Sequence, residues 1–262
     1  MAVKYAQKVS CYRLGIYGNF LNVSAIQCFY GKPTDIVPLG RLYGSFLTNI
    51  VSPLRQSLRQ AIIRTMNIER LQQQFQFIVE IDKLKSVLRR TYLVNDSRRE
   101  NTAEHSWHLT VMAILLAEHA NEQIDLLRVL KMLIIHDIVE IDTDDTFCYD
   151  DAGNLTKADR ENRAADRIFN LLPADQASEL RNLWAEFEQR DTSEAKFAAA
   201  LDRLIPLLHN YHTEGRSWRE HNIKSTQVMQ RNRHIGEGSD SLWEFAQNLI
   251  NEAIDRKHLS VG

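Results

Sequence analysis

Four residues carry side chains of the kinds that bind transition metals in proteins. They are His105, the adjacent pair His136–Asp137, and Asp202. Two imidazoles with two carboxylates suit Mn, Fe, Co, Ni or Zn. Asp202 lies in the otherwise apolar run FAAALDRLIPLL, where an uncompensated carboxylate would be costly to bury. A single histidine on a helix is more often a core or surface residue than a ligand, so the metal hypothesis depends on the four residues together.

Helices are needed to bring these residues into contact. Gly (10 residues) and Pro (5 residues) are scarce in the 262-residue chain, and Leu, Ala, Glu, Gln and Arg are abundant, which indicates a mostly helical fold. From Met66 onward, apolar residues recur at the three- and four-residue spacing of amphipathic helices. Asn101 and Glu104 predict a capping box at the start of the helix that carries His105. The predicted helices cover about 66–90, 101–119, 125–139, 157–172, 175–190, 193–209 and 242–254.

The predicted fold class is all-α, a helical bundle over about 66–258 with a central metal site. The 125–139 segment is apolar nearly all round, which predicts a helix at the centre of the bundle, with His136–Asp137 at its end. Facing helices of a bundle can direct side chains to one ion. The acidic segment 142–154 is a predicted loop. We find no strand pair, internal repeat or glycine-rich phosphate loop in the sequence.

The composition excludes several classes of protein. Hydrophobic residues make up 44% and charged residues 25%, which is ordinary globular usage and excludes fibrous, disulfide-stapled and mostly disordered chains. The three cysteines, Cys11, Cys28 and Cys148, form no CxxC pair. Their odd number predicts reduced thiols and a cytoplasmic location, without a zinc ribbon.

The charge distribution divides the chain near Met66. Residues 1–65 hold eight basic residues and one acidic residue, a net charge of +7, and the remainder holds 24 basic and 33 acidic residues, a net charge of −9. We therefore predict a basic extension over 1–65 and one domain over 66–262. The extension could be a disordered arm, a small packed segment, or sequence upstream of the true start; we favour the last, because Met66 opens a strongly patterned helix. Its scattered basic residues do not predict nucleic-acid binding, and its apolar stretch, 14–30, does not predict a membrane span.

The order H…HD…D on consecutive helices resembles the HD-domain metal-dependent phosphohydrolases over about 66–235. The runs RENTAEHSW, IIHDIVEIDTDDT and ALDRLIPLL are similar to the branch that contains the 5'-deoxynucleotidases. The resemblance implies that the four residues bind a divalent ion, which could be Mn, Co, Fe, Ni, Zn or Mg.

The same resemblance implies three further site residues. Glu140, one turn after Asp137, matches an acid beside the metal water, and Asp145 matches a second acid; the two would divide the acid and base roles. Arg90 matches the arginine that approaches the substrate phosphate. The chain also departs from the branch, with Thr91 where a tryptophan is common and Asp144 where a glycine is usual.

The implied function is hydrolysis of a (deoxy)nucleoside 5'-monophosphate to nucleoside and phosphate through a metal-activated water. The expected partner is a small phosphorylated substrate, with no stable nucleic acid and no membrane; a homodimer is expected by analogy. Two alternatives stay open: an HD-domain phosphodiesterase or alarmone hydrolase, and a non-catalytic metal-binding helical module. The complete ligand set with Glu140 argues against the module, and the context of His105 and Glu140 argues mildly against the other hydrolases.

Overall fold

The computed structural model describes residues 52–145, 149 and 155–262. The three cysteines and most of the basic extension lie outside these residues. The chain divides into two compact units, Met1–Gln60 and Ala61–Gly262. The elements are α2 (Ser52–Ile81), η2 (Asp82–Ser86), β1 (Leu88–Tyr92), β2 (Arg99–Asn101), α3 (Thr102–Leu116), η3 (Ala117–His119), α4 (Leu126–Ile135), α5 (Glu140–Thr143), α7 (Lys157–Phe169), α8 (Ala174–Gln189), α9 (Ser193–His212), α10 (Arg216–Glu220), α11 (Ser225–Asn232), α12 (Ile235–Gly238) and α13 (Asp240–Asp255).

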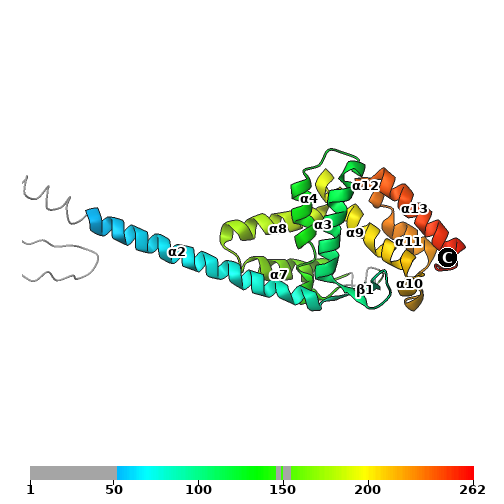
Figure 1. Cartoon of the computed structure of the whole chain (residues 1–262), viewed down its shortest axis with the longest axis horizontal. Coiled ribbons are helices and arrows are strands. Elements are labelled where there is room, and N and C mark those ends of the chain that lie inside the picture. The colour runs from blue at the N-terminus through cyan, green and yellow to red at the C-terminus, as the bar shows by residue number, and fades with distance from the viewer. Residues whose placement is uncertain (1–51, 146–148, 150–154) are drawn as a thin grey trace, which may run out of the picture. The chain divides into compact units, whose positions relative to one another are not determined.

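Helix α9 forms the centre of the second unit. Every residue from Phe197 to Asp202 is buried, and α3, α4, α8, α12 and α13 all pack against this helix (Figure 1). Three consecutive alanines in that stretch let neighbouring helices approach closely from several sides. The prediction that the 125–139 helix is central was wrong, because Leu127 and Ile134 of α4 are 63% and 47% exposed. The apolar pattern of a segment shows which of its residues are hydrophobic. It does not show which of those residues become buried against another helix.

The predicted helix over 66–90 was wrong at both ends. Helix α2 begins at Ser52 and ends at Ile81, so Met66 lies within a continuous helix. A 3-10 turn follows, and the chain then enters strand β1. Whether residues 1–65 belong to the functional protein stays a prediction, but the start of a helix no longer supports it.

A two-stranded antiparallel sheet connects α2 to α3, although the sequence indicated no strand pair. Leu88 pairs with Asn101 and Tyr92 with Arg99, with an irregular register between them. The sequences LRRTY and REN lack the alternation of apolar and polar residues that marks a half-buried strand. The hairpin is therefore stabilised by backbone pairing between its strands and is not signalled by a side-chain pattern.

The remaining helices agree with the predicted ranges to within a few residues, and the all-α class is confirmed. The short helices α10, α11 and α12 were not predicted. Helix α12 packs tightly on α9 at Gly238, where a Cβ atom would lie 2.4 Å from the backbone oxygen of Lys196. Among the described helices, none has the length and apolar character needed to cross a membrane.

Candidate active site

The predicted capping box is present and fixes the first turn of α3. The Asn101 side chain accepts a hydrogen bond from the Glu104 backbone N–H at 2.9 Å, and the Glu104 carboxylate accepts one from the Asn101 N–H at 3.2 Å. This reciprocal cap stabilises the start of the helix. His105 follows at once, with a completely buried side chain.

His136 and Asp137 follow the last residue of α4, where the chain turns toward α5. His136 Nδ1 lies 2.9 Å from the Leu133 carbonyl, so Nδ1–H donates there and Nε2 is the nitrogen that faces the cluster. The Trp184 indole N–H donates to the His136 carbonyl at 3.0 Å, and the Phe187 ring lies 4.8 Å from the imidazole. These contacts hold the ring with Nε2 directed at the carboxylates.

The Nε2 atoms of both histidines converge on the two aspartates. His105 Nε2 lies 3.1 Å from Asp202 Oδ1, and His136 Nε2 lies 3.0 Å from Asp137 Oδ2. The crossed distances are 3.8 Å, from His105 to Asp137, and 3.7 Å, from His136 to Asp202. Two atoms that each lie about 2.0–2.2 Å from one ion are about 3.0–3.5 Å apart, so these spacings approximate a coordination shell. His136 Nε2 has no hydrogen-bond partner among the described residues.

The electrostatics of the cluster also fit a cation. Burial acts to lower the pKa of His136, but Asp137 and Asp202 outweigh it and raise the pKa to about 10. Burial acts to raise the pKa of Asp202, yet Arg203 and the two histidines hold it well below its usual value. A divalent cation would compete with the proton for these same lone pairs. The four residues therefore fit a divalent metal ion, whose identity the donor set leaves open.

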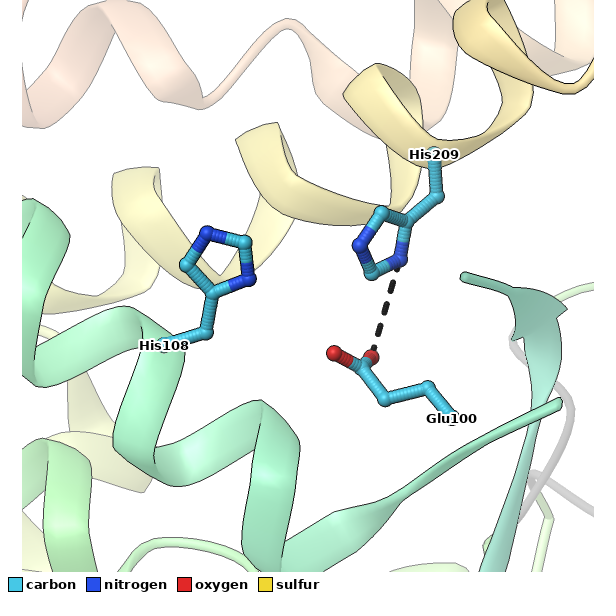
Figure 2. A group of neighbouring side chains, drawn as sticks. All are labelled: Glu100, His108 and His209. Atoms are coloured by element: carbon cyan, nitrogen blue, oxygen red, sulfur yellow. Dashed lines mark ion pairs between the residues drawn. The ribbon is translucent and has the colours of Figure 1, made fainter. Parts of the chain in front are cut away.

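Glu100 is a buried acid beside the cluster that the sequence analysis missed. It lies on β2 with 2% of its surface exposed, and its Oε2 lies 3.4 Å from His105 Nδ1 and 3.6 Å from His209 Nδ1. Figure 2 shows the side chains of Glu100, His108 and His209 directed toward one another. The only signal in the sequence was its place in the run RENTAEHSW, five residues before His105.

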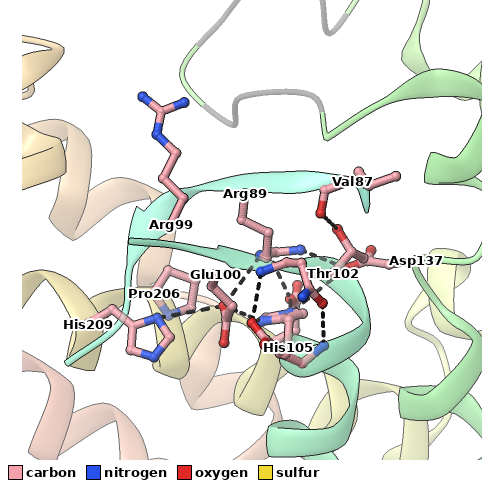
Figure 3. Close-up of polar contacts among 12 residues, drawn as sticks. Val87, Arg89, Arg99, Glu100, Thr102, His105, Asp137, Pro206 and His209 are labelled. Carbon is pink, nitrogen blue, oxygen red and sulfur yellow. Dashed lines mark hydrogen bonds and ion pairs between the residues drawn. The ribbon is translucent and has the colours of Figure 1, made fainter. Parts of the chain in front are cut away.

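Arg89, which the sequence analysis did not select, is the arginine that contacts the cluster. Its guanidinium donates to Asp137 Oδ2 at 2.7 Å and lies 4.0 Å from Asp202. Figure 3 shows Arg89 directed into the polar network, while Arg99 points away from it. Arg90, the predicted phosphate ligand, is the more exposed of the two, and both arginines line the cavity that contains the cluster. The segment was predicted as helix and the resemblance selected Arg90, so the contact of Arg89 with the cluster was missed.

Glu140 and Asp145 lie on the cavity that contains the metal cluster. Glu140 is buried at the start of α5, and its Oε2 accepts a hydrogen bond from Thr102 Oγ1 at 2.9 Å. Burial, together with the charges of Asp137 and Asp145, raises the pKa of Glu140 well above its usual value, although Arg89 opposes the shift. A buried carboxyl with a raised pKa in a cavity is a candidate proton carrier.

The cavity has a volume of about 280 Å³ and contains His136, Asp137 and Asp202 in its wall. This is near the lower end of small-molecule sites, which span roughly 300–1,000 Å³. Several cationic side chains also line it, as an anionic ligand requires: Arg89, Arg90, Lys157, Arg190, Arg203 and Arg231.

Comparison with known proteins identifies relatives that match the part of the chain containing this site. Two curated proteins named 5'-deoxynucleotidase HDDC2 match, one from Bos taurus at 30% identity over 148 residues and one from Homo sapiens at 31% over 134. These matches cover 56% and 51% of this chain, and 70% and 64% of the relatives. The crystal structure of a predicted metal-dependent phosphohydrolase from Magnetospirillum magnetotacticum MS-1 is 52% identical, with a TM-score of 0.71, over 73% of this chain and 96% of that one.

A family model described as HD domain matches residues 81–243. This range covers more than half of the chain and includes all four predicted metal ligands. The resemblance that the H…HD…D order indicated is therefore confirmed, and the chain belongs to the HD-domain family.

Proposed function

We propose that this protein is a metal-dependent phosphomonoesterase that hydrolyses a nucleoside or deoxynucleoside 5'-monophosphate to the nucleoside and phosphate. The observation that carries the proposal is one cavity that joins the His/Asp cluster, the buried acid Glu140 and a cationic wall. The metal-dependent phosphohydrolase from Magnetospirillum supports the reaction class. The curated relatives, whose matched regions span about two thirds of their length, support the nucleotide substrate.

His105, His136, Asp137 and Asp202 would hold the ion. A bound divalent ion supplies a Lewis acid and lowers the pKa of water toward neutrality. Arg89 can hold phosphoryl oxygens, because a guanidinium offers five donors and Asp137 accepts from only one Nη. The buried ion pair with Asp137 also keeps this arginine at the cluster before substrate binds.

Glu140 is suited to hold a proton at the reacting oxygens. Thr102 Oγ1 already donates to its Oε2, which orients the carboxyl group. The raised pKa of Glu140 keeps it protonated at higher pH than an ordinary glutamate, which suits a general acid for the departing sugar oxygen. Asp145, on the same cavity, would take the opposite role and orient the attacking water.

Thr91 bears on the sugar preference. Its side chain lines the cavity, and its buried hydroxyl has no hydrogen-bond partner among the residues that the structure describes. A tryptophan common in the 5'-deoxynucleotidases would fill this space. A threonine leaves room and a hydroxyl for the sugar, so we expect weaker discrimination between ribose and deoxyribose.

The physiological ion (Mn, Co, Fe, Ni, Zn or Mg), the homodimer and the cytoplasmic location remain predictions.

A phosphate-release screen tests the proposal. Purified protein with each divalent ion would be offered matched ribo- and deoxynucleoside 5'-monophosphates, 3'-monophosphates, cyclic nucleotides and a guanosine bispyrophosphate. We expect phosphate release from 5'-monophosphates. Asp202→Asn should abolish it and remove the ion at the His105 cluster, since an amide carries no negative charge for the ion.

The other outcomes separate the alternatives. Cyclic-nucleotide opening or pyrophosphate release without phosphate release would favour the HD-domain phosphodiesterase or alarmone hydrolase. Stoichiometric metal binding with no turnover of any of these substrates would favour the non-catalytic module.

A further inference from the structure

A second group of metal-binding side chains lies beside the HD cluster. Glu100, His108 and His209 each place a ligand atom within 4.8 Å of the other two (Figure 2). His108 lies one helical turn after His105 on α3, and His209 lies two turns after Asp202 on α9. The packing of α3 against α9 that assembles the first cluster therefore assembles this one too.

Two of the three side chains are buried with unsatisfied polar atoms. Glu100 and His209 are each 2% exposed, and neither Glu100 Oε2 nor His209 Nδ1 has a hydrogen-bond partner among the residues described. These two atoms are 3.6 Å apart, beyond the range of a protein hydrogen bond. The spacing is close to the roughly 3.3–3.5 Å that separates two ligands of one tetrahedral zinc ion. The buried atoms are thus placed as co-ligands and not as a donor and acceptor.

The third side chain completes a donor set. The rings of His108 and His209 have centroids 6.1 Å apart with an interplanar angle of 47°, so the rings are not stacked and both can face a common point. Burial lowers the pKa of His209 to about 4, which leaves this imidazole neutral at neutral pH. Two imidazoles and one carboxylate are a zinc donor set.

We propose that Glu100, His108 and His209 form a second divalent-metal site, of the zinc type, distinct from the HD cluster. Glu100 connects the two sites, because its Oε2 also lies 3.4 Å from His105 Nδ1. This contact is longer than a normal hydrogen bond, but a carboxylate beside the outer nitrogen of a metal-ligating histidine favours the orientation of that ligand. A second ion on Glu100 would compete for that oxygen and so adjust the first site. This inference does not depend on the identity of the substrate.

Metal stoichiometry tests the second site without any activity measurement. Full-length protein would be dialysed to equilibrium against free Zn²⁺ and its zinc measured by elemental analysis. We expect two ions per chain in the wild type, one in His108→Ala, one in His136→Ala and none in the double variant. His119→Ala is the matched control, since His119 is exposed and belongs to neither cluster, and it should retain two ions.

Cobalt spectroscopy locates the ion that remains. In His136→Ala, bound Co²⁺ should give visible d–d bands that disappear when His108→Ala is added. His108 is half-buried, so its truncation should leave the fold intact, which circular dichroism would check. Glu100→Gln, nearly the same size, supplies an independent variant and should also bind one ion fewer than the wild type. A single ion in saturated wild-type protein, or undiminished zinc in both His108→Ala and Glu100→Gln, would overturn the second site.

Discussion

Glu140 lies beside the four proposed ligands and accepts a hydrogen bond from Thr102, but it is not one of them. Glu140→Gln should therefore keep the ion at the HD cluster and lose turnover. General acid–base assistance contributes about 10²–10⁴-fold, so kcat should fall within that range. The amide can still accept from Thr102, which preserves the local fold. Elemental analysis and steady-state kinetics provide the test: unchanged kcat removes Glu140 from the mechanism, and loss of the ion makes it a ligand.

Arg89 and Arg90 are adjacent in the sequence but differ in position. Arg89 is half-buried at the cluster, and Arg90 is exposed. Arg89→Ala should lower kcat/KM about 10- to 100-fold, which corresponds to a hydrogen bond with a charged group. Arg90→Ala is the matched control and should have a smaller effect. The comparison uses steady-state kinetics on the best nucleotide from the screen, and a larger effect of Arg90→Ala would favour Arg90, the arginine that the sequence predicted.

At the scale of elements, Asp144 ends α5 in a strained backbone conformation. Its φ is 56° and its ψ is 166°, a region that glycine tolerates and other residues rarely adopt. The resemblance to the 5'-deoxynucleotidases places a glycine here, and this geometry explains why. Asp144→Gly should raise the free energy of unfolding by about 1 kcal/mol. Asp144→Ala removes the same charge but keeps a Cβ atom, so it should not raise that free energy. Urea denaturation measures both, and equal stability of the two variants would show that φ is not the cause.

Helix α7 contains a carboxyl group that should make stability depend on pH. Burial raises the pKa of Glu161 to about 7, even though Lys157 lies 3.4 Å away; Glu188 and Asp137 add to the shift. The folded state therefore holds this proton more tightly than the unfolded chain, and stability falls as pH rises from about 4.5 to 7.

Glu161→Gln removes that dependence. Relative to the wild type, the variant should be more stable by about 1–3 kcal/mol at pH 8. This gain should vanish near pH 4, because there Glu161 of the wild type is protonated in both the folded and the unfolded state. Urea denaturation of both proteins at each pH gives the difference, in which the shared loss of metal at low pH largely cancels. A difference that does not change with pH would mean that Glu161 ionises as it does in the unfolded chain.

At the scale of the whole molecule, the part of α2 from 61 to 69 packs little against the rest of its own unit. All side chains from 61 to 69 are exposed, and Arg70 of α2 donates to Asp175 of α8 at 2.7 and 2.9 Å. Farther along, Phe77 is buried. Residues 66–262 alone should therefore fold with a melting temperature near that of the full chain and keep its kcat/KM. Insoluble protein, or folded but inactive protein, would show that residues 1–65 complete the core or the site.

The four candidate ligands and the helices that carry two of them, His105 and Asp202, could be predicted from the sequence. Apolar spacing and the capping box of Asn101 are short-range patterns, whereas the order H…HD…D spans residues 105–202 and was informative through the family resemblance. The structure brings His105, His136 and Asp202 together as that resemblance implied. A helix is stabilised by contacts between residues three and four apart, so the chain itself records where helices form.

The hairpin and its side chains were decided by tertiary structure. Leu88 pairs with Asn101 across a loop, and no apolar alternation in LRRTY or REN indicates it. Because the strand was unpredicted, nothing in the sequence indicated that Arg89 contacts Asp137 of the cluster. Glu100 likewise gained significance only when β2 brought it against His209, 109 positions later in the chain. The sequence determined which side chains could bind metal, and the pairing of distant segments determined which of them meet, because that depends on contacts that no local pattern encodes.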